Sequence, residues 1–472
     1  MGAVGLNFGS ATSGAGFDVT ATVNQIVTNL QAVEKPWKDQ LTSLQARDTA
    51  LSSLGTQLSS LSTDLQNLTD FNGTLAYKTG SSSDTNILSL SSANASAISG
   101  THTIIVQNLA QTSSAATDAV TASDTLTGGI TCKIGNGSWQ TVNVGDGNTA
   151  HTLAGLSAAI NLASVGVTAS VLTNADGTAR ISLVSKTSGA NGEITIADAT
   201  NHAASPTTLA DSTTADVNPG LGLATIQDGK DAKMQVDGVS VTSSSNTVSN
   251  AIPGVVFQLL SANQNATVQV IIANDTKSIE TAINTFVTDY NAVMKAINSQ
   301  ESKDSSGNPE PLYGTAVLAH LQQGLQSALS STFGSGTINS LISLGITANP
   351  SADGSISLNA DTLSAALNAN FSMVVSFFQD AGMFGPRFST TLNNLGSSST
   401  KSAITLALKE DSRQEATLNG NVSRQEAQID TQKTNLTAEL NLANQILQSI
   451  PQQIQQVNEM YSAITGYNSK NG

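Results

Sequence analysis

The sequence predicts an α+β multidomain protein, in which a terminal α-helical coiled-coil stalk encloses β-rich head domains, one carrying an inserted small α+β module. Three observations carry this prediction. Apolar residues recur every seven positions near both ends of the 472-residue chain, they alternate with polar residues in the middle, and one short helical stretch interrupts the alternation.

The composition is acidic and poor in charged side chains. The chain holds 19 Lys and Arg against 34 Asp and Glu, a net charge of −15. Nucleic-acid binding and docking on anionic lipid both need basic surface, so we expect neither a nucleic-acid nor a membrane partner. No run approaches the ~18 apolar residues of a membrane-spanning helix. Cys132, the single cysteine, excludes an intrachain disulfide and a Cys-rich zinc site.

The first residues carry no basic side chain before Lys35, so the sequence predicts no Sec-type signal peptide. Residues 1–17 contain five glycines and no charge. We expect this segment to be disordered on its own, because it buries too little apolar surface to offset chain entropy.

Residues 18–70 are predicted to be helical, with Asp18 as the cap and Pro36 as a kink. Two heptad rows run along this stretch, typical of a coiled coil. One row is Val23, Leu30, Trp37, Leu44, Leu51, Leu58 and Leu65, and the other is Val19, Ile26, Val33, Leu54, Leu61 and Leu68, interrupted by Gln40 and Arg47.

The C-terminal residues form two matching rows, and Pro451 is expected to interrupt that helix. The rows are Leu408, Val422, Ile429, Leu436, Ala443, Ile450, Val457 and Ile464, with Leu440, Leu447, Ile454 and Tyr461 beside them. A lone amphipathic helix cannot bury these side chains, so the two ends must pair with each other or with another chain. The predicted partner-binding residues are Leu30, Trp37, Leu44, Leu436, Ala443, Leu447, Ile450, Ile454 and Val457.

Between the ends, short apolar runs predict strands at 87–90, 103–106, 234–241, 255–260 and 268–272, the third folded into a hairpin at Asp237-Gly238. Residues 119–223 predict an inserted hairpin–helix–hairpin module, with a linker at 200–222. From residue 278 the helical period resumes. An aromatic patch of Phe371, Val374, Val375, Phe377 and Phe378 is predicted to be its core.

Four parts follow from these patterns. They are terminal leg helices (1–45 with 430–472), a helical leg domain (46–80 with 276–429), a β-rich head domain (81–118 with 224–275) and an inserted β-rich head domain (119–223).

No motif predicts catalysis, a cofactor or a metal. The four histidines are scattered without ligand spacing, and the Gly-rich stretches lack the residues of a phosphate or dinucleotide loop. We therefore expect no catalytic residue, no cofactor and no metal site.

Five segments in order resemble the flagellar hook-associated protein 2 (FliD) family of filament caps. They are GAGFDVTATVNQIVTNL at 14–30, ASAISGTHTIIVQNLAQTSS at 95–114, DAKMQVDGVSVTSSSNTVSNAIPGVVFQLL at 231–260, FVTDYNAVMKAI at 286–297, and LISLGITANPSADGSISLNADTLSAAL at 341–367. The resemblance covers nearly the whole chain.

The resemblance implies a homo-oligomeric ring of a few protomers at the distal tip of the bacterial flagellum, outside the cell. It implies export through the flagellar type III system and, as partners, flagellin, a hook-associated junction protein and a type III export chaperone. Head domains would form a plate that retains exported flagellin, and the legs would reach into the filament end.

Three alternatives stay open at this point. A secreted adhesin or glycan-binding stalk protein, or a phage-type tail component, would share the Ser/Thr-rich β domains and the helical stalk. A carbohydrate-active enzyme would need paired carboxylates, which no motif singles out. A hook–filament junction protein would share the coiled coils and the small module, although the segments at 231–260 and 341–367 favour the cap.

Overall fold

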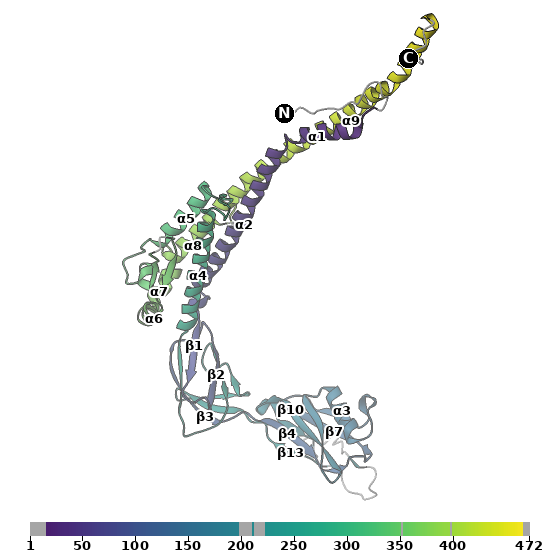
Figure 1. Cartoon of the computed structure of the whole chain (residues 1–472). Helices are drawn as coiled ribbons and strands as arrows, with labels where there is room; N and C mark the ends of the chain where they lie inside the picture. The colour runs from purple at the N-terminus through teal and green to yellow at the C-terminus, as the bar shows by residue number, and fades with distance from the viewer. Residues whose placement is uncertain (1–15, 198–209, 212–221, 351–352, 397–398, 466–472) are drawn as a thin grey trace. The chain divides into compact units, whose positions relative to one another are not determined.

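The computed structural model describes residues 16–197, 210–211, 222–350, 353–396 and 399–465 (Figure 1). The predicted disorder of residues 1–17 and the predicted linker at 200–222 lie outside this range, apart from residues 16–17, 210–211 and 222. The chain forms two compact units, residues 1–70 with 280–472 and residues 71–279. Helices at both ends and antiparallel sheets between them confirm the α+β multidomain class. The finer division into four parts stays a prediction.

Three helices form the leg of the first unit: α1 (Val19–Gln31), α2 (Lys35–Thr69) and α9 (Ala403–Thr465). The carboxylate of Asp18 accepts a hydrogen bond from the Ala21 N–H (2.9 Å), which confirms the predicted cap. The chain leaves the helix at residues 32–34 and resumes with Pro36 in the first turn of α2, a position that needs no N–H donor. Both α1 and α2 lie against α9 (Figure 1).

The predicted interruption at Pro451 is wrong, because the 63-residue helix α9 continues through this proline. A proline inside a helix removes one backbone hydrogen bond and crowds the preceding turn. The strong helix formers around it, chiefly glutamines and apolar residues, keep the remaining bonds.

Shorter elements complete the helical unit. This unit resumes at residue 280, four residues after the start of α4. They are α4 (Thr276–Gln300), α5 (Ala316–Leu329), α6 (Ala360–Ala369), α7 (Phe371–Gln379), α8 (Phe384–Leu395), and the hairpin of β19 (Ile346–Ala348) and β20 (Ile356–Leu358).

Aromatic rings form the core of this unit. Phe384 stacks on Phe377 and on Phe388, each with ring centroids 5.2 Å apart. Of the predicted patch, Val374, Phe377 and Phe378 are fully buried, whereas Phe371 and Val375 are half-buried.

The head sheet of the second unit is antiparallel, in the order β1-β18-β3-β14-β15, and it shares one apolar core with the smaller sheet β16-β17-β2. The strands are β1 (Lys78–Ser82), β2 (Leu88–Ala93), β3 (Gly100–Asn108), β14 (Ala232–Val236), β15 (Val239–Ser243), β16 (Thr247–Val248), β17 (Val255–Leu259) and β18 (Val268–Asn274). The predicted hairpin is confirmed, with Asp237 at φ 51° and Gly238 at φ 85°, the left-handed pair that a type I′ turn requires.

The inserted module packs helix α3 (Leu153–Ala163) against short antiparallel sheets with a separate apolar core. Its strands are β4 (Thr112–Thr117), β5 (Val120–Thr121), β6 (Leu126–Thr127), β7 (Gly129–Ile134), β8 (Gln140–Asn143), β9 (Val167–Thr173), β10 (Thr178–Ser188), β11 (Ile194–Ile196), β12 (Ala210–Asp211) and β13 (Leu223–Gln227). The predicted hairpins are β7–β8 and β9–β10, with α3 between them. Strand β4 pairs with β10, and β13 pairs with β4. In the sequence these two strands lie just before and at the end of the predicted module, residues 119–223.

Candidate functional site: the leg seam

We use the term leg seam for the heptad rows of α1, α2 and α9, which include the nine predicted partner-binding residues. The side chains of these rows become more exposed toward the C-terminal end of α9. Leu44 is buried, Leu30 and Trp37 are half-buried, and so are Leu436, Ala443, Leu447 and Ile450. By contrast, Ile454 is 42 % exposed and Val457 is 62 % exposed.

The start of α1 is tied to α9 at one residue. The Phe17 N–H donates a hydrogen bond to Oδ1 of Asn444 (2.9 Å), and Gly16 lies against the same side chain. Figure 1 shows α9 continuing beyond α1 from this region toward its C-terminal end. Helix α1 therefore covers the leg seam of α9 only as far as about Asn444.

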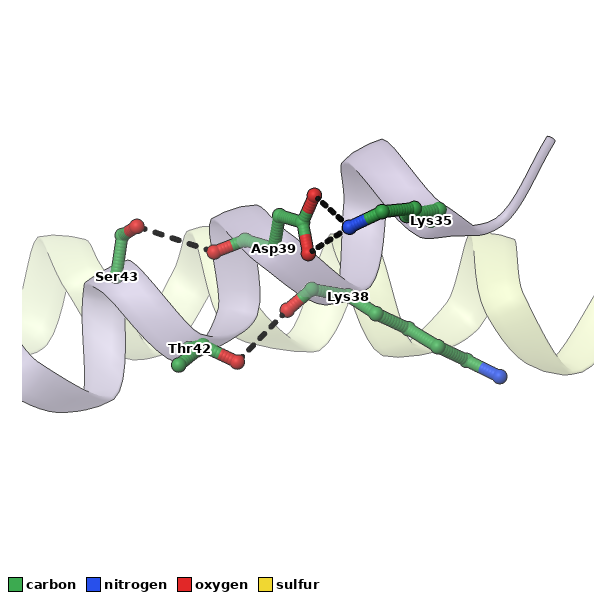
Figure 2. Close-up of polar contacts among 5 residues, drawn as sticks. All are labelled: Lys35, Lys38, Asp39, Thr42 and Ser43. Carbon is green, nitrogen blue, oxygen red and sulfur yellow. Dashed lines mark hydrogen bonds and ion pairs between the residues drawn. The ribbon is translucent and has the colours of Figure 1, made fainter. Parts of the chain in front are cut away.

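Lys38 links α2 to α9 near the junction with α1. Its ammonium lies 2.8 Å from Glu34, whose side chain is only 1 % exposed, and 3.3 Å from Glu426 of α9. Hydrogen bonds to Glu34 and Glu426 raise the pKa of Lys38 above its ordinary value. Figure 2 shows the Lys38 side chain extended away from the neighbouring Lys35–Asp39 ion pair, in front of the α9 ribbon.

A buried ion pair crosses the leg seam one heptad further along α2 than Gln40. A guanidinium nitrogen of Arg47 lies 2.9 Å from Oδ1 of Asp411 on α9, whose side chain is fully buried. Burial raises the pKa of Asp411, the charges of Asp48 and Glu415 raise it further, and Arg47 lowers it. Arg47, which interrupts the apolar row in the sequence, thus has its partner in the opposite helix.

A carboxyl pair joins α2 to α4. The Asp64 side chain hydrogen-bonds to Asp289, and burial together with this contact raises the pKa of Asp64 to about 6. Ionisation of Asp64 would bring two negative charges together, so Asp64 keeps its proton up to about that pH.

The sequence patterns did not single out Asp411, Glu34 or the Asp64–Asp289 pair. Asp411 falls in neither heptad row of the C-terminal residues, so the rows gave no signal for it. Nothing local connects Asp64 to Asp289.

Across the residues that the structure describes, no group of three or more His, Cys, Asp or Glu side chains is placed to hold a metal ion. In the same residues, no helix is long and apolar enough to cross a membrane. The arrangement of the leg seam is suited to binding helices, with apolar layers for affinity and buried polar pairs that fix the register.

Two family models match the chain. The model for the flagellar hook-associated protein 2 C-terminus matches residues 229–468, and the model for the N-terminus of the same proteins matches residues 15–113.

Curated relatives carry the same name. The B-type flagellar hook-associated protein 2 of Pseudomonas aeruginosa is 26 % identical over 78 % of this chain and 80 % of its own length. The flagellar hook-associated protein 2 of Escherichia coli K12 is 26 % identical over 76 % of this chain and 78 % of its own length.

A solved structure has a similar fold. The D1-D2-D3 domains of the flagellar cap protein FliD from Escherichia coli match with a TM-score of 0.57 at 25 % identity, over 77 % of this chain and 99 % of that one. With both family models matched in chain order, and the C-terminal model alone spanning 229–468, the chain belongs to the flagellar hook-associated protein 2 (FliD) family.

Proposed function

We propose that this protein caps the distal end of the bacterial flagellar filament, outside the cell. The observation that carries the proposal is the leg seam of a FliD-family chain, which stays exposed at Ile454 and Val457 on the C-terminal part of α9. The relatives' name and the solved FliD cap protein support the same role. The role is structural and requires no catalytic step.

The β-rich domains are the proposed ring-forming part. Copies that join head to tail through unlike surfaces close into a ring when the rotation between them divides a full turn. A ring of a few protomers would retain exported flagellin beneath it and promote its folding and insertion into the filament. The flagellar type III system would export the chain, and a hook-associated junction protein would hold the first cap.

The leg seam is the proposed contact with the filament and, before export, with a type III chaperone. Burying an exposed Ile or Val side chain contributes about 1.5–3 kcal/mol, so a few such residues give a firm contact that still exchanges. The nine leg-seam residues include the exposed Ile454 and Val457 and the half-buried Leu447 and Ile450.

Complementation tests the proposal. A strain that lacks the protein is supplied with the wild type, with Val457→Glu or with Gln456→Glu, and filament length and flagellin in the medium are measured. Val457 and Gln456 are both exposed, so neither change disturbs the fold, and both add one negative charge. We expect short filaments and released flagellin with Val457→Glu and near-normal filaments with Gln456→Glu.

Full-length filaments in the strain without the protein would refute the cap role. Equal behaviour of the two variants would refute the role of the leg seam while leaving the cap role standing.

A further inference from the structure

The helical unit holds a pocket of about 550 Å³ that shares no residue with the leg seam, and we name it the Arg387 pocket. It lies between the end of α5, the residues that follow α5, and α8; Figure 1 shows these two helices side by side. Among the described residues that line it, Arg387 is the only charged one. The others include the ring of Phe333 and the hydroxyl-bearing residues Ser331, Thr332, Thr390 and Thr391. A volume of this order is typical of small-molecule sites.

Two contacts hold the guanidinium of Arg387 in place. Its Nε–H donates a hydrogen bond to the carbonyl oxygen of Gly382 (2.8 Å), and its Cζ lies 6.0 Å from the centroid of the Phe333 ring. That ring is buried and packs against Phe377 and Phe384, each with ring centroids 6.0 Å apart. An arginine that is already oriented loses less side-chain freedom when a ligand binds, so the site is prepared in the free protein.

Arg387 has no acidic partner in the part of the chain that the structure describes, whereas Arg47 is paired with Asp411. The N–H groups of its terminal nitrogens likewise have no acceptor among those residues. Such a guanidinium presents a planar fork of donors that matches the two oxygens of a carboxylate. One guanidinium balances a single negative charge, so a carboxylate suits this chain of net charge −15 better than a phosphate dianion does.

The hydroxyl groups of the pocket are acceptors. Those of Ser331, Thr390 and Thr391 each donate a hydrogen bond to the main-chain carbonyl four residues earlier. Their oxygens therefore keep lone pairs for the N–H or O–H groups of a ligand. We propose that the Arg387 pocket binds a small carboxylate that carries hydroxyl or amide donors beside its acid group.

Two sources offer this chemistry. One is an acidic side chain of a peptide, whose own backbone supplies the amide donors, and the other is a free hydroxy acid. The Arg387 pocket belongs to α5 and α8 and not to the leg seam, so the proposal stands or falls separately from the cap role.

Ligand-observed NMR titration of the purified full-length protein tests the proposal. N-acetyl-glutamate N-methylamide represents the acidic peptide side chain, and D-gluconate represents the free hydroxy acid. N-acetyl-glutamine N-methylamide and sorbitol are their uncharged counterparts. We expect at least one acid to bind about tenfold more tightly than its counterpart, because only the acid forms charge-assisted hydrogen bonds. The acid that binds more tightly identifies the source.

Two variants assign the binding to the pocket, and circular dichroism checks that each one is folded. Arg387→Met removes the charge, with Arg413→Met on α9 as its control. Thr390→Glu places a competing carboxylate in the lining, and Thr417→Glu is its control, because both threonines are exposed helix residues that donate to the carbonyl four residues earlier. Both pocket variants should weaken binding of the acid about tenfold, and both controls should bind as the wild type does.

Failure of both acids to bind, or equal affinity of each acid and its uncharged counterpart, would overturn the proposal. Undiminished binding of the acid to Thr390→Glu would also overturn it, and this variant decides the question even where Arg387→Met does not fold, because Thr390 is exposed.

Discussion

The guanidinium of Arg47 on α2 lies 2.9 Å from the carboxylate of Asp411 on α9, and solvent does not reach the Asp411 side chain. Asp48 and Glu415 face the same carboxyl group, so Arg47 is the cation that offsets three acidic residues between two helices. Removing one partner of a buried pair is more harmful than removing both, because it leaves an unpaired charge without water.

Arg47→Met is therefore expected to lower the free energy of unfolding by about 3 kcal/mol near neutral pH. The loss should shrink as the pH is lowered from neutral, because the raised pKa of Asp411 allows it to bind a proton and remain neutral. Urea unfolding followed by helical circular dichroism measures the loss across a series of pH values. Arg413→Met, on an exposed part of α9, is the matched control. A loss that stays the same as the pH is lowered would contradict this account.

The Asp64–Asp289 pair should make the helical unit more stable in mild acid. The pKa of Asp64 in the folded chain is about 6, above its ordinary value of 3.8, so folding favours the protonated form. The stabilisation is complete below the ordinary value and is lost as the pH rises through about 6. After allowance for solvent screening, the change between about pH 5 and pH 7 should be on the order of 1 kcal/mol.

Asp64→Asn should remove most of this pH dependence and raise stability near neutral pH, because the amide imitates the protonated acid. Asp430→Asn changes an exposed carboxylate of α9 and should leave the slope unchanged. Parallel slopes for wild type and Asp64→Asn would show that the carboxyl pair is not the titrating group.

Asp18 should control the fraying of α1. Its carboxylate accepts the Ala21 N–H, so Asp18→Ala is expected to cost about 1 kcal/mol in local stability. Hydrogen exchange in residues 19–23 should become several-fold faster, whereas exchange in α2 should not change. Thr20→Ala, which leaves the cap intact, should keep wild-type protection. Unaltered exchange after Asp18→Ala would contradict a stabilising role for the cap.

Deletion of residues 1–40 separates the two proposed parts of the molecule. The deletion removes α1, Trp37 and Lys38 and uncovers the leg seam of α9, but it leaves the head sheet and the inserted module complete. Ring formation through the heads should persist, while capping of filaments should be lost. Mass measurement and negative-stain imaging report the ring, and filament elongation reports capping. Monomers after deletion would contradict this division.

Sequence patterns predicted the elements whose residues repeat strongly. The heptads of Leu51, Leu58 and Leu65 predicted α2, and Asp237-Gly238 predicted a hairpin, because each depends on residues close together in the chain. Pro451 was misjudged, since the cost of one lost hydrogen bond is small against a long run of helix formers.

Other features depend on residues that are distant in sequence. Asp411 is 364 positions after Arg47 in the numbering, and only the folded chain opposes them. Strands β4 and β13 consist mainly of Ala, Ser, Thr and Leu without clear alternation, so their pairing with the module's sheet was not evident. Likewise, the heptad rows predicted contact residues but not where α1 stops covering α9.

The unbroken course of α9 from Ala403 to Thr465 has a mechanical consequence. At 1.5 Å per residue this single helix is about 95 Å long. Its buried end carries Ile404 and Asp411 in the helical unit, and its other end is the exposed Ile464. A torque applied at that far end meets no break in the helix, so it is transmitted along α9 toward the layer where Arg47 holds Asp411.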